Sequence, residues 1–249
     1  MSPGKLTEME KERYKRQLLI KGFGQKAQLS LARSTVGVLG VGGLGSPACM
    51  YLTAAGVGRL ILIDDQIPEV SNLNRQVLHW ERDVSSGREK VESAAWKLKE
   101  MNSDLEIVEI SERVTKKNLS AVLKDADVML DCTDNFETRY LLNRFCVEEK
   151  VPFVHAAVEG MCGQITTIVP GKTPCLRCLF PRPPPKRQDI AILGATAGVF
   201  GAMQATEAIK LITGVGETLR SKLLVGDLSC NTWDVIEVSR DKGCPVCRR

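Results

Sequence analysis

The sequence predicts an α/β fold, a mostly parallel Rossmann-like sheet with helices on both faces, followed by mixed or antiparallel strands. Strand-like and helix-like segments alternate along the first 158 residues, as they do in proteins built from βαβ units. A β-branched run, Thr35–Gly40, leads straight into a glycine-rich turn and a helical segment. Beyond residue 158 the alternation ends, and short strands with two Cys-x-x-Cys pairs follow.

Local residue patterns place the elements in order, beginning with a helix around Glu12–Ile20. The first half is predicted to contain strands at Thr35–Gly40, Arg59–Asp64, Glu106–Ser111, Asp127–Thr133 and Pro152–Val158, and helices at about Leu44–Val57, Lys90–Met101, Lys116–Lys124 and Asn135–Lys150. The second half is predicted to contain strands at Gly163–Val169, Lys222–Leu228 and Trp233–Ser239, and a long helix of small residues at Thr196–Thr213.

Two connections have unusual lengths or compositions. The loop from Asp65 to about Gly87 is longer than a structural connection needs, which predicts a functional role. The segment Phe180–Arg187 has the sequence FPRPPPKR. Because proline removes backbone donors and fixes φ, this segment is expected to form an exposed, mobile crossover.

Length and composition narrow the function classes. The 249 residues suit one α/β domain, with a nucleotide-binding half at 1–158 and a crossover and knuckle half at 159–249. A net charge of +4 with 5% aromatic residues argues against a dedicated nucleic-acid binder. The N-terminus has no apolar signal segment, and no apolar run approaches the roughly 20 residues that span a bilayer. We therefore expect a cytoplasmic protein without membrane contact, whose nine cysteines are metal ligands, core residues or reactive thiols.

A nucleotide site is predicted at the glycine-rich turn. Gly40, Gly42, Gly43 and Gly45 fit the G-x-G-x-x-G pattern between a strand and a helix, and Asp64 ends the next strand. Such glycines let backbone N–H groups approach phosphate, and an aspartate at this spacing accepts hydrogen bonds from ribose hydroxyls. Because NAD and ATP both use this element, it does not identify the nucleotide.

The polar residues of the neighbouring loops favour ATP with Mg²⁺ over a dinucleotide. A triphosphate with magnesium needs cations for its oxygens and a carboxylate for the metal, whereas a pyrophosphate is satisfied by the glycine turn. Singly, Lys90 and Arg16 could be solvated helix charges, and Asp134 could cap the following helix. The residues that a dinucleotide would leave unexplained are Arg16, Arg75, Lys90 and Asp134.

Four ordered segments resemble the MoeB/ThiF (HesA) family of ubiquitin-activating-type adenylyltransferases. They are GVLGVGGLGSP, IDDQIPEVSNLNRQ, GREKVESA and DCTDNFETR, and the resemblance extends from about Arg13 to Cys247. It implies that Asp64 binds ribose and that Asn72, Arg75 and Lys90 contact the triphosphate. It also implies that Asp134 binds magnesium and is central to catalysis. Arg16 would reach the phosphates of the other subunit, so that a homodimer would complete its active sites in trans.

The resemblance further implies the reaction and its partners. The C-terminal glycine carboxylate of a ubiquitin-like sulfur-carrier protein would attack the α-phosphate of ATP and release pyrophosphate. The product would serve molybdopterin, thiamine or tRNA thiolation pathways, with a sulfurtransferase or cysteine desulfurase as a further partner. No general base is needed, since a carboxylate is ionised at neutral pH. Two alternatives remain open: a small-molecule carboxylate as the acceptor, and an NAD-dependent oxidoreductase or non-catalytic nucleotide-binding module.

The cysteines divide into two groups. Spacing and the family resemblance together predict a structural zinc site at Cys175, Cys178, Cys244 and Cys247, since each Cys-x-x-Cys can supply two thiolates. Family members often use a cysteine of the crossover to capture the carrier or sulfur covalently. Here the crossover has none, and Cys230 lies in a turn, which argues against a covalent intermediate. Residues expected to be buried or structural are Cys49, Cys132, Cys146, Cys162, His79 and His155.

Overall fold

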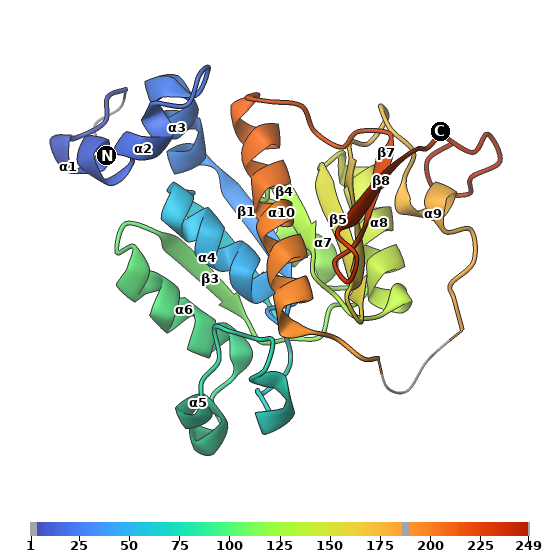
Figure 1. The fold of residues 1–249 in the computed structure, drawn as a ribbon, viewed down its shortest axis with the longest axis horizontal. Coiled ribbons are helices and arrows are strands. Elements are labelled where there is room, and N and C mark those ends of the chain that lie inside the picture. The colour runs from blue at the N-terminus through green and yellow to red at the C-terminus, as the bar shows by residue number, and fades with distance from the viewer. Residues whose placement is uncertain (1–3, 186–189, 249) are drawn as a thin grey trace.

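The structure, a computed structural model, describes residues 4–185 and 190–248 and contains an eight-stranded sheet (Figure 1). The strand order is β3-β2-β1-β4-β5-β6-β7-β8. Neighbours among the first five strands are parallel, and β5 to β8 pair antiparallel, which confirms the predicted fold class. The strands are β1 (Thr35–Leu39), β2 (Arg59–Ile63), β3 (Glu106–Ile110), β4 (Val128–Asp131), β5 (Phe153–Glu159), β6 (Cys162–Ile168), β7 (Lys222–Asp227) and β8 (Thr232–Glu237).

Helices cover both faces because the central strands are apolar on both sides. Val36 and Val38 of β1 pack into one core, while Leu39 of β1 and Met129 of β4 pack into the other. The first face is covered by α3 (Gly24–Arg33), α4 (Gly45–Ala55), α6 (Lys90–Met101) and α10 (Gly194–Thr213), and the second by α7 (Leu119–Leu123), α8 (Phe136–Glu149) and α9 (Leu176–Leu179) (Figure 1).

The N-terminal region differs from the prediction. The expected helix Glu12–Ile20 is instead two short helices, α1 (Glu8–Arg13) and α2 (Lys15–Leu18), separated by a non-helical residue. A reciprocal capping box between Thr7 and Glu10 fixes the earlier start. Helix α3, which buries residues on its inner face, was not predicted.

The long loop after β2 contains structure of its own. A 3₁₀ turn, Val70–Asn72, and a short helix, α5 (Glu81–Ser86), lie inside the segment that was expected to be a loop. The other predicted elements are present with ends shifted by a few residues; for example, α10 begins at Gly194 and not at Thr196.

The proline-rich crossover connects α9, which covers the second face of the sheet, with α10, which covers the first. Its residues 181–185 are exposed, and residues 186 and 187 of the predicted segment lie outside the described part of the chain, so its mobility stays a prediction. On the return, the N–H of Gly160 donates to the Ala191 carbonyl and the N–H of Leu193 donates to the Gly160 carbonyl. Across the described residues, none of the helices is both long and apolar enough to cross a bilayer.

Candidate active site

The predicted site residues follow the carboxyl ends of adjacent parallel strands. Leu39 at the end of β1 is in register with Ile63 of β2 on one side and with Asp131 of β4 on the other. The glycine turn, the acidic residue after β2 and the segment after β4 therefore begin at one edge of the sheet. This edge is where open α/β sheets bind ligands.

Two glycines of the turn, Gly40 and Gly45, pack too closely against backbone atoms to tolerate a side chain. Gly40 has a φ of +93°, and a Cβ there would lie 2.7 Å from the Cys132 carbonyl oxygen. A Cβ on Gly45 would lie 2.0 Å from the Gly40 carbonyl oxygen. The backbone N–H groups of Gly42 and Gly43 donate to no group within the described residues. The turn thus presents free donors at the N-terminus of α4, an arrangement that suits phosphate oxygens.

A buried histidine supports the turn from below. The Nε2 atom of His79 lies 2.8 Å from the Val41 carbonyl, and its Nδ1 lies 3.0 Å from the Ser93 hydroxyl. Since a carbonyl only accepts, Nε2 carries the proton and donates. Burial lowers the pKa of His79 to about 4, so the ring is neutral at neutral pH. This agrees with the structural role expected for His79.

Asp64 binds the turn and keeps capacity for a ligand. Its carboxylate accepts hydrogen bonds from the N–H groups of Val41, at 2.8 Å, and Gln66, at 3.1 Å. Burial raises the pKa of Asp64, although the positive charge of Lys90 opposes the shift. A carboxylate has about four lone-pair positions, so two backbone donors leave room for ribose hydroxyls.

Lys90 is buried and makes no salt bridge within the described part of the chain. Its side chain is 3% exposed, so the alternative that it is a solvated helix charge is wrong. The ammonium donates to the Gln66 amide oxygen at 2.7 Å. No carboxylate oxygen of the described residues lies within 4 Å of it. The charge of the Asp64 carboxylate acts on Lys90 without a direct contact. A buried cation that is not directly paired is costly, and the site therefore favours a negatively charged ligand.

The long loop supplies further polar groups beside the turn. The Arg75 side chain lies against Gly43, and among the described residues its guanidinium donates to the Ser71 carbonyl and the Asn74 amide oxygen alone. Gln76, which sequence reasoning did not single out, is buried next to Gly42, and its amide oxygen has no partner in the part of the chain that the structure describes. Asn72 also stabilises the loop, because its side-chain oxygen accepts a hydrogen bond from the Glu69 N–H.

Asp134 is exposed, and it is not the helix cap. The cap of α8 is Asn135, whose side-chain oxygen accepts from the Thr138 N–H at 2.9 Å. Asp134 accepts one side-chain hydrogen bond, from the Asn135 amide at 3.2 Å. Magnesium is usually held in proteins by one or two carboxylates with phosphate oxygens and waters. The free oxygens of Asp134 fit that coordination.

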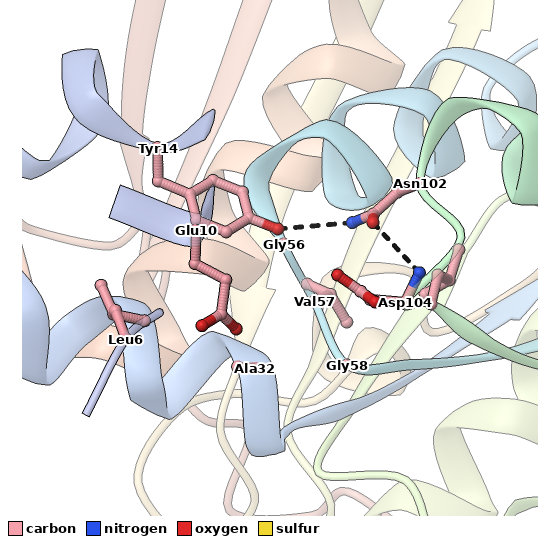
Figure 2. Close-up of a pocket in the computed structure, with 10 residues that line it drawn as sticks. Leu6, Glu10, Tyr14, Ala32, Gly56, Val57, Gly58, Asn102 and Asp104 are labelled. Carbon is pink, nitrogen blue, oxygen red and sulfur yellow. Dashed lines mark hydrogen bonds between the residues drawn. The ribbon is translucent and has the colours of Figure 1, made fainter. Parts of the chain in front are cut away.

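Arg16 lies at the opposite edge of the sheet from these residues. Its neighbour Gln17 donates to the Ala55 carbonyl at the C-terminal end of α4, whereas the glycine turn is at the N-terminal end. Tyr14, just before α2, receives a hydrogen bond from Asn102 in a pocket below the amino ends of β2 and β3 (Figure 2). Arg16 is exposed there, so one chain does not bring it to its own candidate site.

The four knuckle cysteines converge although 65 residues separate the two pairs. Their sulfur atoms all lie within 4.8 Å of one another. Cys175 is 3.7 Å from Cys244, and Cys178 is 3.3 Å from Cys247. Tetrahedral zinc with bonds of about 2.3 Å places its sulfurs about 3.8 Å apart. The cluster could therefore hold zinc, and buried Asn143 supports it by accepting from the Leu176 N–H.

Comparison with known proteins decides the family. The model of the ThiF family matches residues 14–246, which include the glycine turn, the loop residues, Asp134 and three of the four knuckle cysteines. The chain belongs to the ThiF family. The resemblance to the MoeB/ThiF group expected from the sequence is thereby confirmed.

Named relatives of this ThiF-family chain cover most of its length. It is 45% identical to the vegetative protein HesA of Trichormus variabilis, over 97% of this chain and 91% of that protein. It is 43% identical to the SAMP-activating enzyme E1 of Haloferax volcanii, over 95% and 88% of the two chains. It is 44% identical to the adenylyltransferase and sulfurtransferase MOCS3-1 of Drosophila pseudoobscura pseudoobscura, and spans 55% of that protein. The crystal structure of E. coli MccB with ATP superposes with a TM-score of 0.85 at 28% identity, over 98% of this chain and 76% of MccB.

One cysteine of the ThiF-family chain lies elsewhere than expected. Cys49, Cys132 and Cys146 are buried, as predicted, but Cys162 is exposed. It begins β6, in register with Glu159 of β5 on one side and Asp227 of β7 on the other. The prediction failed because a cysteine looks the same in a sequence whether its strand position is buried or at an edge.

We expect the purified chain to carry about one zinc ion, because four thiols at these distances, three of them buried and Cys178 half-buried, match a structural site. Cys247→Ser should lower the zinc content and the melting temperature, and should affect ATP affinity much less, since the knuckle lies apart from the glycine turn. Elemental analysis and thermal unfolding check this. Cys230→Ser, an exposed cysteine outside the cluster, is the matched control. Native protein purified without chelators and free of zinc would contradict the assignment.

Proposed function

We propose that this ThiF-family chain, an adenylyltransferase, uses ATP and Mg²⁺ to adenylylate the C-terminal glycine carboxylate of a ubiquitin-like sulfur-carrier protein, with release of pyrophosphate. The observation that carries the proposal is the burial of Lys90. Its ammonium lies near Asp64 but forms no direct ion pair with a described residue. A triphosphate supplies the missing negative charge, and Arg75 adds a second cation without a carboxylate partner at the turn.

The arrangement favours a triphosphate over NAD. The glycine turn alone satisfies a pyrophosphate, and NAD chemistry gives no role to a buried lysine or to an exposed carboxylate after β4. ATP uses each group: Asp64 for the ribose, Asn72, Arg75 and Lys90 for the phosphates, and Asp134 for magnesium. Gln76, with its orphaned amide oxygen, adds a further polar contact at the turn.

The reaction requires the chain to position the two substrates and to neutralise the negative charge of the phosphates. The acceptor carboxylate attacks the α-phosphorus, the bond to the bridging oxygen breaks, and pyrophosphate leaves with the electron pair. When bound, Mg²⁺ would supply positive charge to the phosphate oxygens. Lys90 and Arg75 would bind the oxygens on which charge accumulates, in a site already shaped for them.

The names of the relatives support a carrier protein as the acceptor. One relative is an E1 enzyme that activates SAMP, and another is an adenylyltransferase and sulfurtransferase. We therefore place the reaction in sulfur transfer for molybdopterin, thiamine or tRNA thiolation. A sulfurtransferase or a cysteine desulfurase would be the next partner.

We further propose a homodimer whose sites are completed in trans. Arg16 is a cation exposed at the amino edge of the sheet, remote from its own glycine turn. In a dimer that places this edge over the carboxyl edge of the partner subunit, Arg16 would reach the bound phosphates.

ATP–pyrophosphate exchange tests the function directly. Exchange requires a reversible adenylylation and an acceptor carboxylate, so we expect it only when a carrier that ends in glycine is present. The matched control is the same carrier without its last glycine, which should support no exchange. Exchange that depends on a small carboxylic acid, with no response to any carrier, would contradict a protein acceptor.

A further inference from the structure

A buried ionic network lies directly beneath the turn that carries Asp134. Asp131, the last residue of β4, has no solvent exposure, and Arg139 of α8 is 7% exposed. The carboxylate of Asp131 lies 3.9 Å from the Nε atom of Arg139 and 2.7 Å from Nδ1 of His155. A buried ion pair adds little net stability compared with apolar packing, so its presence here calls for another role.

The network clamps Thr133, the residue before Asp134. One oxygen of the Asp131 carboxylate accepts from the Thr133 N–H at 3.2 Å and from its hydroxyl at 2.8 Å. Arg139 donates to the Thr133 carbonyl at 2.7 Å. That carbonyl belongs to the peptide bond between Thr133 and Asp134. Arg139 therefore fixes the orientation of this peptide plane, and with it the direction in which the Asp134 side chain points.

Further hydrogen bonds hold Asp131 and Asp134 in their observed orientations. His155 of β5 donates from Nδ1 to the Asp131 carboxylate, since a carboxylate only accepts, and burial lowers the pKa of His155 and favours its neutral form. Gln204 of α10 donates to the Asp131 carbonyl at 2.8 Å. The cap residue Asn135 bonds to Asp134 itself. Groups from β5, α8 and α10 therefore determine the conformation of a three-residue turn.

From these contacts we propose that Asp131 and Arg139 are positioning residues that orient the Asp134 carboxylate toward the magnesium of the bound triphosphate. This inference rests on the proposed role of Asp134 as the metal ligand. Asp134 is exposed and has one side-chain partner, so without the clamp its carboxylate would be free to leave the metal. Replacing a residue that orients a metal ligand typically costs about 10- to 100-fold in metal affinity or activity.

The test is the magnesium dependence of ATP binding. Titration calorimetry with ATP, with and without Mg²⁺, is applied to Asp131→Asn and Arg139→Gln. We expect both variants to keep the magnesium-free affinity of the wild type and to need about 10- to 100-fold more Mg²⁺ for half of the metal-dependent gain. Arg139→Lys, which keeps the charge, should recover part of the loss. Pyrophosphate exchange should show the same shift in half-saturating Mg²⁺.

Controls separate positioning from general stability. Glu207→Gln alters a buried carboxylate that binds the Thr167 hydroxyl and the Leu219 N–H, away from the glycine turn. It should lower the urea midpoint and leave the Mg²⁺ requirement unchanged. If Asp131→Asn does not fold, Thr133→Val removes one hydrogen bond of the clamp in a side chain of the same shape.

Two results would overturn the inference, and they are distinguishable. If Asp134→Asn changes the Mg²⁺ requirement but folded clamp variants do not, the clamp is structural and the proposed function stands. If Asp134→Asn itself leaves the Mg²⁺ requirement unchanged, both the inference and the metal role of Asp134 fail.

Discussion

Lys90→Met should slow carrier-dependent pyrophosphate exchange by about a hundred- to thousand-fold, the usual cost of losing one preorganised charge contact to developing negative charge. Methionine fills the buried space of the lysine stem, so the change removes the charge, the hydrogen bond to Gln66 and the electrostatic interaction with Asp64. The variant should also unfold at a higher temperature than the wild type when no nucleotide is present. The reason is that a buried charge without a direct ion pair among the described residues, which Asp64 offsets only in part, has been removed.

Lys99→Met on the same helix is the matched control for this change. Lys99 is exposed, and its substitution should alter neither exchange nor melting temperature. A Lys90→Met enzyme with wild-type exchange would remove the main support for a triphosphate at this site. A variant with a lower melting temperature would show instead that the lysine stabilises the free protein.

Asp134→Ala should produce the larger loss, beyond that of Lys90→Met, because losing the metal removes two positive charges at once. Asp134 is exposed and does not cap α8, so the variant should fold as stably as the wild type. Pyrophosphate exchange measures the loss, and thermal unfolding measures the stability. An active Asp134→Ala enzyme would contradict the magnesium assignment.

Mixing two inactive variants extends this prediction to the dimer. Arg16→Ala should also be inactive if Arg16 acts on the phosphates of the partner subunit. A mixed dimer of Arg16→Ala and Asp134→Ala chains would contain one site with both residues intact, so activity should partly return. A fully active wild-type monomer at high dilution would contradict completion in trans.

Much of the fold was predictable because its signals are local. Thr35–Leu39 is a β-branched run, and the following glycines permit the tight turn, so β1 and α4 could be placed closely. Helix α3 was not predicted, although the apolar residues Phe23, Ala27 and Leu31 recur every four residues, a spacing that indicates a helix. The capping-box motif of Thr7 and Glu10 also indicates where α1 begins, but the prediction did not take it into account.

The candidate site was predictable in outline, because parallel strands place their carboxyl ends along one edge. That rule predicts, from the sequence alone, that Gly40, Asp64 and Asp134 lie close together. It did not reveal that Asp64 binds the turn, or that Asn135 and not Asp134 caps α8. Those facts depend on side-chain geometry, which neighbouring residues set.

Local sequence patterns are enough to predict the alternation of strands and helices, the glycine turn and the candidate residues of the site. Each depends on a few consecutive residues, whose propensities act locally. Packing between distant segments decides that Lys90 is buried without a salt bridge to any described residue, that Cys162 is exposed, and that Arg16 lies at the far edge of the sheet. It also decides that Asp131 and Arg139 clamp the turn before Asp134. Burial and convergence arise from packing between segments distant in the chain, and no local pattern encodes that packing.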